Sequence, residues 1–183
     1  MTNSGSIVVT ALSAAALCAA APVLAGTVLV PPSGETATVT HYTGRVINTE
    51  YLGDGVSESL VEMTGISRNT VGQSAFDGMD AHCLMLSAII GGKPRREGAC
   101  TQTDRDGDHA FTSFDSAAYK LIGGTGKYKG ISGSGLYSVT PEPSAEPGRY
   151  GYVMKHDTTW TIPAAPPVVN GDPVGRRGIR TWP

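Results

Sequence analysis

Three aspartates at alternate positions form the densest group of possible metal ligands in the sequence. Asp104, Asp106 and Asp108 could converge their oxygens on a hard cation such as calcium. A calcium loop of the EF-hand type requires glycine at its sixth position and glutamate at its twelfth, where this chain has His109 and Asp115. A polar hairpin tip explains the same residues. We therefore predict a hairpin, with Asp106 and the glycine after it forming a two-residue type I′ turn.

The best candidates for ligand binding lie on one alternating segment, Tyr152–Ile162. Its apolar and aromatic side chains alternate with charged and hydroxyl side chains, which predicts a half-buried strand. We predict that four side chains of the apolar face contact a ligand: Tyr152, Met154, His156 and Trp160. His156 would be an acid–base group or a polar handle for that ligand. The plainer alternative is a histidine that is hydrogen-bonded within the core.

The remaining residues match no catalytic, metal or cofactor motif. The other histidines, His41, His82 and His109, are scattered without metal-ligand spacing. Gly130–Gly133 lacks the second glycine of a serine-hydrolase elbow. The glycine-rich run 122–135 fits neither the Walker A pattern nor the dinucleotide fingerprint. We predict no metal and no cofactor, and the catalytic residues stay unknown.

Two cysteines lie beyond the first 25 residues, Cys83 and Cys100. An even pair of cysteines in a small exported domain forms a disulfide in most cases. No Cys-x-x-Cys motif supports a zinc or redox role. The predicted disulfide closes a loop whose restraint is worth roughly 3 kcal/mol in the chain-entropy model.

Short alternating runs separated by glycine and proline turns must position these residues. The expected strands are Ala37–Tyr51, Ser59–Ser67, Ala81–Ile90, Ala99–Thr103, His109–Phe114, Tyr119–Ile122, Gly135–Thr140 and Tyr152–Ile162. Seven or eight short strands, each followed by a turn, predict an all-β sandwich or a closed antiparallel barrel. Closure is attractive because it removes exposed strand edges.

The segment Gly123–Gly130, which reads GGTGKYKG, resembles the Gly-Gly-Thr-Gly-x-aromatic element of dirigent proteins and allene oxide cyclase-like barrels. Gly133–Gly135 and the following Tyr137 are similar too. The resemblance implies an eight-stranded closed antiparallel barrel with an interior cavity, and a tight turn or bulge at the glycines. Dirigent proteins orient phenoxy radicals, and allene oxide cyclases guide a ring closure. No position here matches those families' catalytic residues, so the resemblance leaves function open.

The N-terminus has the shape of a secretory signal peptide. Residues 1–25 contain no charged side chain and end in Val23-Leu24-Ala25, which puts small or compact residues at the −3 and −1 positions that a signal peptidase reads. An uncleaved membrane anchor is the alternative. We predict a signal peptide over 1–25, an extension over 26–36, a barrel over 37–162 and a mobile or surface-draped tail over 163–183. The protein is thus expected in the periplasm or outside the cell, with no stable membrane span after processing.

The charge balance excludes one large class of partners. Fourteen basic and 16 acidic residues give a net charge of −2, which offers no electrostatic footprint for nucleic acid. Three functional classes remain: a module that binds a small apolar or aromatic molecule, a cavity cyclase or isomerase, and an envelope interaction protein with a packed barrel. Arg176, Arg177 and Arg180 could dock the tail on an acidic partner, but a solvated terminus is the commoner explanation of such a tail.

Overall fold

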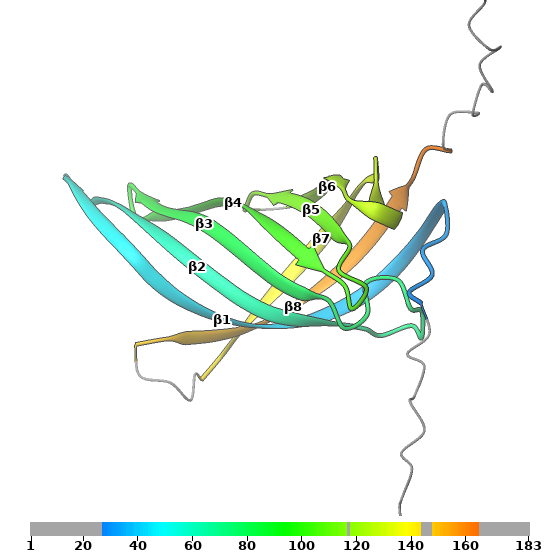
Figure 1. Ribbon diagram of the computed structural model, residues 1–183. Coiled ribbons are helices and arrows are strands. Elements are labelled where there is room, and N and C mark those ends of the chain that lie inside the picture. The colour runs from blue at the N-terminus through cyan, green and yellow to red at the C-terminus, as the bar shows by residue number, and fades with distance from the viewer. Residues whose placement is uncertain (1–26, 117, 144–147, 165–183) are drawn as a thin grey trace, which may run out of the picture.

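Eight antiparallel strands supply nearly all the regular structure in the computed structural model, which describes residues 27–116, 118–143 and 148–164. The strands are β1 (Ser33–Gly53), β2 (Val56–Asn69), β3 (Asp80–Ile90), β4 (Lys93–Thr103), β5 (His109–Phe114), β6 (Ala118–Gly124), β7 (Ser132–Glu142) and β8 (Tyr150–Thr161). Each strand pairs with the next, and β8 pairs with β1, so the sheet closes into a barrel (Figure 1). The predicted all-β, eight-stranded closed barrel is confirmed.

Alternating side chains divide each strand between the barrel interior and its outer surface. In β3, Ala81, Cys83 and Met85 are buried, whereas their neighbours His82 and Leu84 are exposed. In β1, three alternate threonines are buried ahead of a buried tyrosine: Thr36, Thr38, Thr40 and Tyr42. The interior is therefore apolar with scattered hydroxyl groups, and the sequence period of two fixes which side chains face it.

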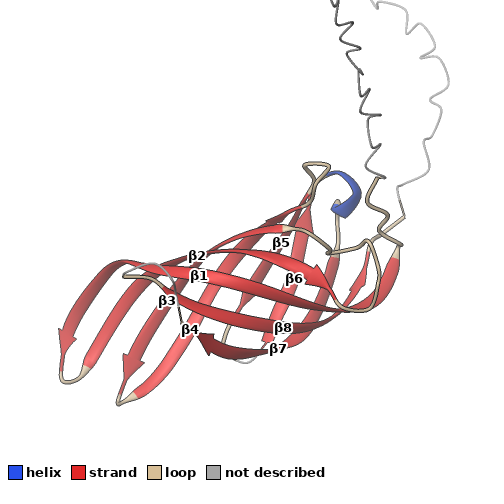
Figure 2. Cartoon of the chain, turned by 90° about the horizontal axis from the view of Figure 1, so that it is seen from below, coloured by secondary structure: helices blue, strands red, loops and turns tan. Residues whose placement is uncertain are grey.

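The strands differ greatly in length, and this difference opens one end of the barrel. The β1–β8 ladder stops at the pair Gly44 and Tyr150, whereas the β1–β2 ladder continues to Gly53 and Val56. The ladder between β4 and β5 likewise stops at Gly98. The β1–β2 and β3–β4 hairpins consequently project beyond the other strands at one end (Figure 2). We call this end the mouth.

The opposite end is filled by a cluster of buried side chains, which we call the plug: Ala75, Phe76, Met79, Ala110, Leu121, Tyr128, Ile131 and Trp160. Phe76 comes from the connection between β2 and β3 and adopts a positive φ of 59°. Its ring meets that of Trp160 edge to face, with centroids 5.2 Å apart. Side chains from two loops therefore close the barrel that the strands alone would leave open.

The glycine-rich segment, for which a tight turn or a bulge is expected, contains one of each. Gly123 has a φ of +140° beside an irregularity in the β5–β6 ladder between Phe111 and Thr112. A single turn of 3-10 helix, η1 (Gly126–Tyr128), follows and begins at a positive φ of 48°. The segment places Tyr128 in the plug, where its side chain is fully buried.

The predicted type I′ turn at Asp106 is wrong. Gly107 has a positive φ of 86°, but Asp106 does not, and the connection between β4 and β5 is five residues long. The Asp104 carboxylate accepts hydrogen bonds from the backbone N–H groups of Asp106 and Asp108, at 2.9 and 3.1 Å. Because a side chain supplies these bonds, the chain adopts a longer loop than a two-residue turn.

Several predicted segments lie at or beyond the limits of the described residues. The predicted signal peptide, with Cys18, lies outside them, as do tail residues 165–183, which include the three arginines. β1 begins at Ser33, four residues before the expected start, because Ser33–Thr36 pair with Thr158–Thr161 of β8. In the part of the chain that is described, no helix has the length and apolar character needed to cross a bilayer.

Candidate functional site

The barrel interior is hollow on the mouth side. A cavity of about 750 Å³ opens there, and apolar and aromatic side chains provide much of its wall. Among them are Val61, Met63, Met85, Phe114, Tyr152 and Met154. Only Arg96 and Glu142 carry charged groups among the described residues that line it. The cavity is therefore suited to a molecule of drug-like size with a largely apolar body.

Rows of paired residues across β2, β3 and β4 build one wall of this cavity. The row nearest the mouth is Ser59, Ser87 and Arg96, and the next is Val61, Met85 and Gly98. Gly98 is required there because a Cβ atom would come within 2.5 Å of the Phe114 ring. The missing side chain lets this ring lie across β4 and line the cavity.

β8 supplies the facing wall, and it carries the four residues predicted to bind a ligand. Tyr152 and Met154 line the large cavity, and His156 lies one pair deeper. Trp160 lies in the plug instead, where its indole Nε1–H donates to the carbonyl oxygen of Pro31 at 3.1 Å. The structure thus brings three of the four residues to the lumen and places Trp160 at the closed end.

The predicted disulfide is confirmed, and it forms part of the lumen floor. Cys83 and Cys100 are direct partners in the β3–β4 ladder, with Cα atoms 4.0 Å apart. Both line a smaller cavity of about 30 Å³ below the large one, together with Tyr42 and His156. The Tyr42 hydroxyl lies 3.9 Å from the Cys83 Sγ, and burial raises the pKa of this tyrosine. Tyr42 is therefore a neutral hydroxyl at the floor.

His156 is the titratable group at the bottom of the lumen. Burial lowers its pKa to about 4, although the nearby Asp157 acts in the opposite direction. Tyr119 packs edge to face against it and forms a hydrogen bond with Thr158. Burial also raises the pKa of Tyr119, to about 12. At neutral pH the floor therefore presents a neutral imidazole and a neutral phenol.

The other three histidines lie away from the lumen. His82 contacts Glu62 at 3.0 Å, and His41 lies 3.4 Å from the Glu142 carboxylate. His109 Nδ1 lies 2.9 Å from the Thr103 hydroxyl, at the closed end of β4 and β5. Within the described ranges, no group of three or more histidine, cysteine or acidic side chains is arranged to hold a metal ion.

Sequence reasoning missed the polar side chains of the mouth, above all Arg96 and Tyr137. Arg96 lines the cavity, and its positive charge acts on Tyr137, Tyr150 and Tyr152. Burial nevertheless raises the pKa of all three tyrosines, so their hydroxyl groups stay protonated. One signal was available: Arg95 and Arg96 are adjacent on a strand, so one of them had to face inward.

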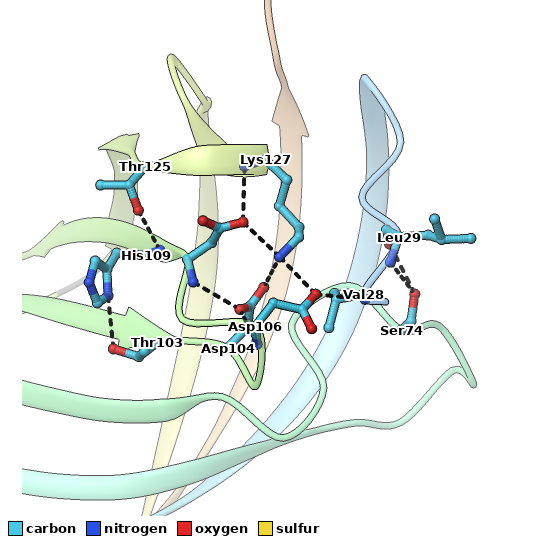
Figure 3. A network of polar contacts seen from close by, with 10 residues as sticks. Val28, Leu29, Ser74, Thr103, Asp104, Asp106, His109, Thr125 and Lys127 are labelled. Carbon is cyan, nitrogen blue, oxygen red and sulfur yellow. Dashed lines mark hydrogen bonds and ion pairs between the residues drawn. The ribbon is translucent and has the colours of Figure 1, made fainter. Parts of the chain in front are cut away.

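The three alternate aspartates surround a lysine. Lys127 Nζ lies 2.8 Å from Asp104, 3.0 Å from Asp106 and 2.8 Å from Asp108 (Figure 3). Burial acts to lower the pKa of Lys127, but hydrogen bonds to the three carboxylates outweigh it and raise the pKa. Asp106 also accepts the Val28 N–H at 2.9 Å. The Lys127 ammonium thus occupies the position between the three carboxylates where a metal ion would bind. It also connects the β4–β5 loop to η1.

Comparisons with known proteins add one structural likeness. No family model matches the chain, and no curated protein matches it either. The solved structure of a pterocarpan synthase dirigent protein aligns with a TM-score of 0.45 and 12% identity, covering 75% of this chain and 90% of that one. At this identity no site residue and no activity is carried across. The expected likeness to allene oxide cyclases stays a prediction.

Proposed function

We propose that this protein binds a small apolar or aromatic molecule in its barrel. The cavity of about 750 Å³ carries this proposal, because the side chains of the plug close the opposite end of the barrel and leave this space open at the mouth. An apolar pocket with a few convergent polar groups is the usual form of a small-molecule site. Tyr152 and Met154 line its wall and His156 lies at its floor, as a ligand-binding role requires.

We further propose that the protein acts after export, in the periplasm or outside the cell. The disulfide supports this location, since such bonds persist mainly in oxidising compartments. A ligand met there would enter at the mouth, where the projecting hairpins form the cavity wall.

A cavity isomerase or cyclase is the second candidate, and His156 favours it. No hydrogen bond to its ring nitrogens occurs among the described residues, and its lowered pKa leaves the ring neutral, with one nitrogen unprotonated, at neutral pH, although it is a weaker base than an exposed histidine. Tyr119 beside it is a neutral proton donor. Replacing His156 by glutamine tests this candidate: an enzyme that uses the imidazole as a base loses turnover of its ligand, whereas an unchanged turnover rate excludes that role.

Filling the mouth tests the binding proposal. Ser87→Trp puts an indole into the cavity, whereas Leu86→Trp places the same group on the outer face of the same strand. We expect Ser87→Trp to weaken binding of the neutral probe N-phenyl-1-naphthylamine at least about tenfold and Leu86→Trp to change it less than about twofold. Equal affinity in both variants and the unmodified protein would place the probe outside the barrel. Native mass spectrometry of protein from its own host then identifies the natural ligand.

A further inference from the structure

The cavity contains one charged group whose position is fixed by the strand pairing. Arg96 faces the lumen in the same row as Ser59 and Ser87, at the point where β4 separates from β5. Its backbone N–H donates to the Ser116 hydroxyl at 3.0 Å, and that hydroxyl donates to the Arg96 carbonyl oxygen at 3.3 Å. The turn between β5 and β6 thus holds the strand that carries the guanidinium.

No carboxylate forms a salt bridge with Arg96 in the described part of the chain. The ion pairs found there involve Arg45, His41, His82 and Lys127. Glu142, the other charged residue at the mouth, has its carboxylate 3.4 Å from His41 Nδ1. Among the described residues, the mouth of the apolar cavity therefore holds a guanidinium that forms no ion pair with an acidic side chain.

Tyrosine hydroxyl groups complete the polar side of the mouth. Tyr150 and Tyr152 pack with ring centroids 5.5 Å apart, within electrostatic reach of Arg96. Tyr137 already donates its hydroxyl hydrogen to the carbonyl oxygen of Asp115. The Tyr152 hydroxyl is buried, which leaves the Arg96 guanidinium and the Tyr150 hydroxyl to bind an anion. The charge-assisted hydrogen bonds of a guanidinium are stronger than those between neutral groups.

Below this polar rim the wall is apolar down to the floor. Met63 and Met154 lie between the mouth and the disulfide, and His156 at the bottom is neutral at physiological pH. An acidic group would thus find a cation only at the mouth, whereas an apolar or aromatic body fits the deeper part. We infer that the ligand is an amphiphilic anion, with an acidic group held at Arg96 and an apolar or aromatic body in the lumen. This inference rests on the proposed function.

Two fluorescent probes that share one ring system test the inference: 9-anthracenecarboxylate, an anion, and 9-anthracenemethanol, which is neutral. The variant is Arg96→Gln. Arg95→Gln is the matched control, because it removes the same charge from the neighbouring position on the outer face, opposite Ala88. Both probes are titrated into the three purified proteins at pH 7.5 and low salt.

We expect Arg96→Gln to weaken binding of the carboxylate about tenfold and to change binding of the alcohol less than about twofold. Arg95→Gln should leave both affinities within about twofold. If Arg96→Gln does not fold, the unmodified protein provides the second readout: added salt should weaken binding of the carboxylate and not that of the alcohol.

Each remaining outcome overturns the inference. Equal carboxylate affinity in the Arg96 and Arg95 variants removes Arg96 as the anion site while lumen binding stands. If Arg96→Gln weakens binding of the carboxylate and the alcohol equally, Arg96 affects only the shape of the cavity and not the binding of an anion. Failure of both probes to bind the unmodified protein overturns the proposed function and this inference together.

Discussion

The imidazole of His156 meets the phenol ring of Tyr119 edge to face, with centroids 5.2 Å apart and an angle of 86° between the rings. The two residues come from β8 and β6, which are not neighbours in the barrel, and they meet across its floor. The Tyr119 hydroxyl also forms a hydrogen bond with the hydroxyl of Thr158, which lies two residues beyond His156 on β8. The floor is therefore a packed polar group that fixes where the cavity ends.

The first prediction concerns pH and His156. Its pKa lies near 4 in the folded protein and near 6.5 when unfolded, so the unfolded chain takes up the proton first as pH falls. Stability from this group is complete above pH 6.5 and is lost towards pH 4, by about 3 kcal/mol. Urea unfolding at pH 7 and pH 4 should show this loss in the unmodified protein and a smaller loss in His156→Gln. The control is His82→Gln, at an exposed site, which should lose as much stability as the unmodified protein between pH 7 and pH 4. If His82→Gln loses as little stability as His156→Gln, the pH dependence does not come from His156.

The second prediction concerns the floor disulfide. The double variant Cys83→Ala/Cys100→Ala should reduce the free energy of unfolding by about 3 kcal/mol, because the bond restrains the unfolded chain. Thermal unfolding with and without a reducing agent measures the effect. The unmodified protein should lose stability in the reducing agent, and the double variant should not respond to it. Identical melting temperatures for the oxidised protein and the double variant would contradict the prediction.

The third prediction concerns the lysine that the three aspartates surround. Lys127→Met leaves these carboxylates close together without their cation, and the Asp104 side chain is fully buried. We expect a loss of about 3 kcal/mol at pH 7 in chemical unfolding. The matched control is Lys129→Met, two residues along and exposed, which should cost less than about 0.5 kcal/mol.

The same variant has an expected pH dependence. The Val28 N–H and then Lys127 lower the pKa of Asp106, and hydrogen bonds with Lys127 lower the pKa of Asp108. The stability that Lys127 contributes is therefore present above the ordinary pKa of these carboxylates and is lost as they protonate. The stability gap between Lys127→Met and the unmodified protein should therefore narrow below about pH 4. A gap that widens on acidification would show that lost packing, and not lost charge, causes the destabilisation.

The fourth prediction separates steric contact from backbone strain at Gly126. Gly126 and Gly91 have similar positive φ angles of 48° and 57°, so alanine is strained at both, by about 1 kcal/mol. A Cβ atom at Gly126 would also overlap the Asp108 carboxylate, whereas nothing lies within 4 Å of one at Gly91. Gly126→Ala should therefore cost at least about 2 kcal/mol more than Gly91→Ala in urea unfolding. Equal costs would mean that the Asp108 carboxylate moves aside freely.

The all-β class and the faces of the strands followed from the sequence by itself. The alternation in Tyr152–Ile162 predicted the inward set of β8, because a strand with one buried face needs a period of two. The cysteine pair and the turn-forming glycines followed from local chemistry in the same way. Strand ends were less well defined, since Ser33–Thr36 are polar and join β1 only because β8 offers a partner.

Tertiary structure alone decided what those faces enclose. Periodicity placed Trp160 and Tyr152 on the same face of β8. Their different positions along the barrel axis put Trp160 in the plug and Tyr152 in the wall of the cavity. That position depends on the ladder register and on Phe76, which a loop brings into the barrel. The convergence of Lys127 on three aspartates, and of Arg96 with the tyrosines of the facing wall, likewise joins segments distant in sequence. Alternation sets the direction of a side chain, whereas closure of the barrel sets its neighbours.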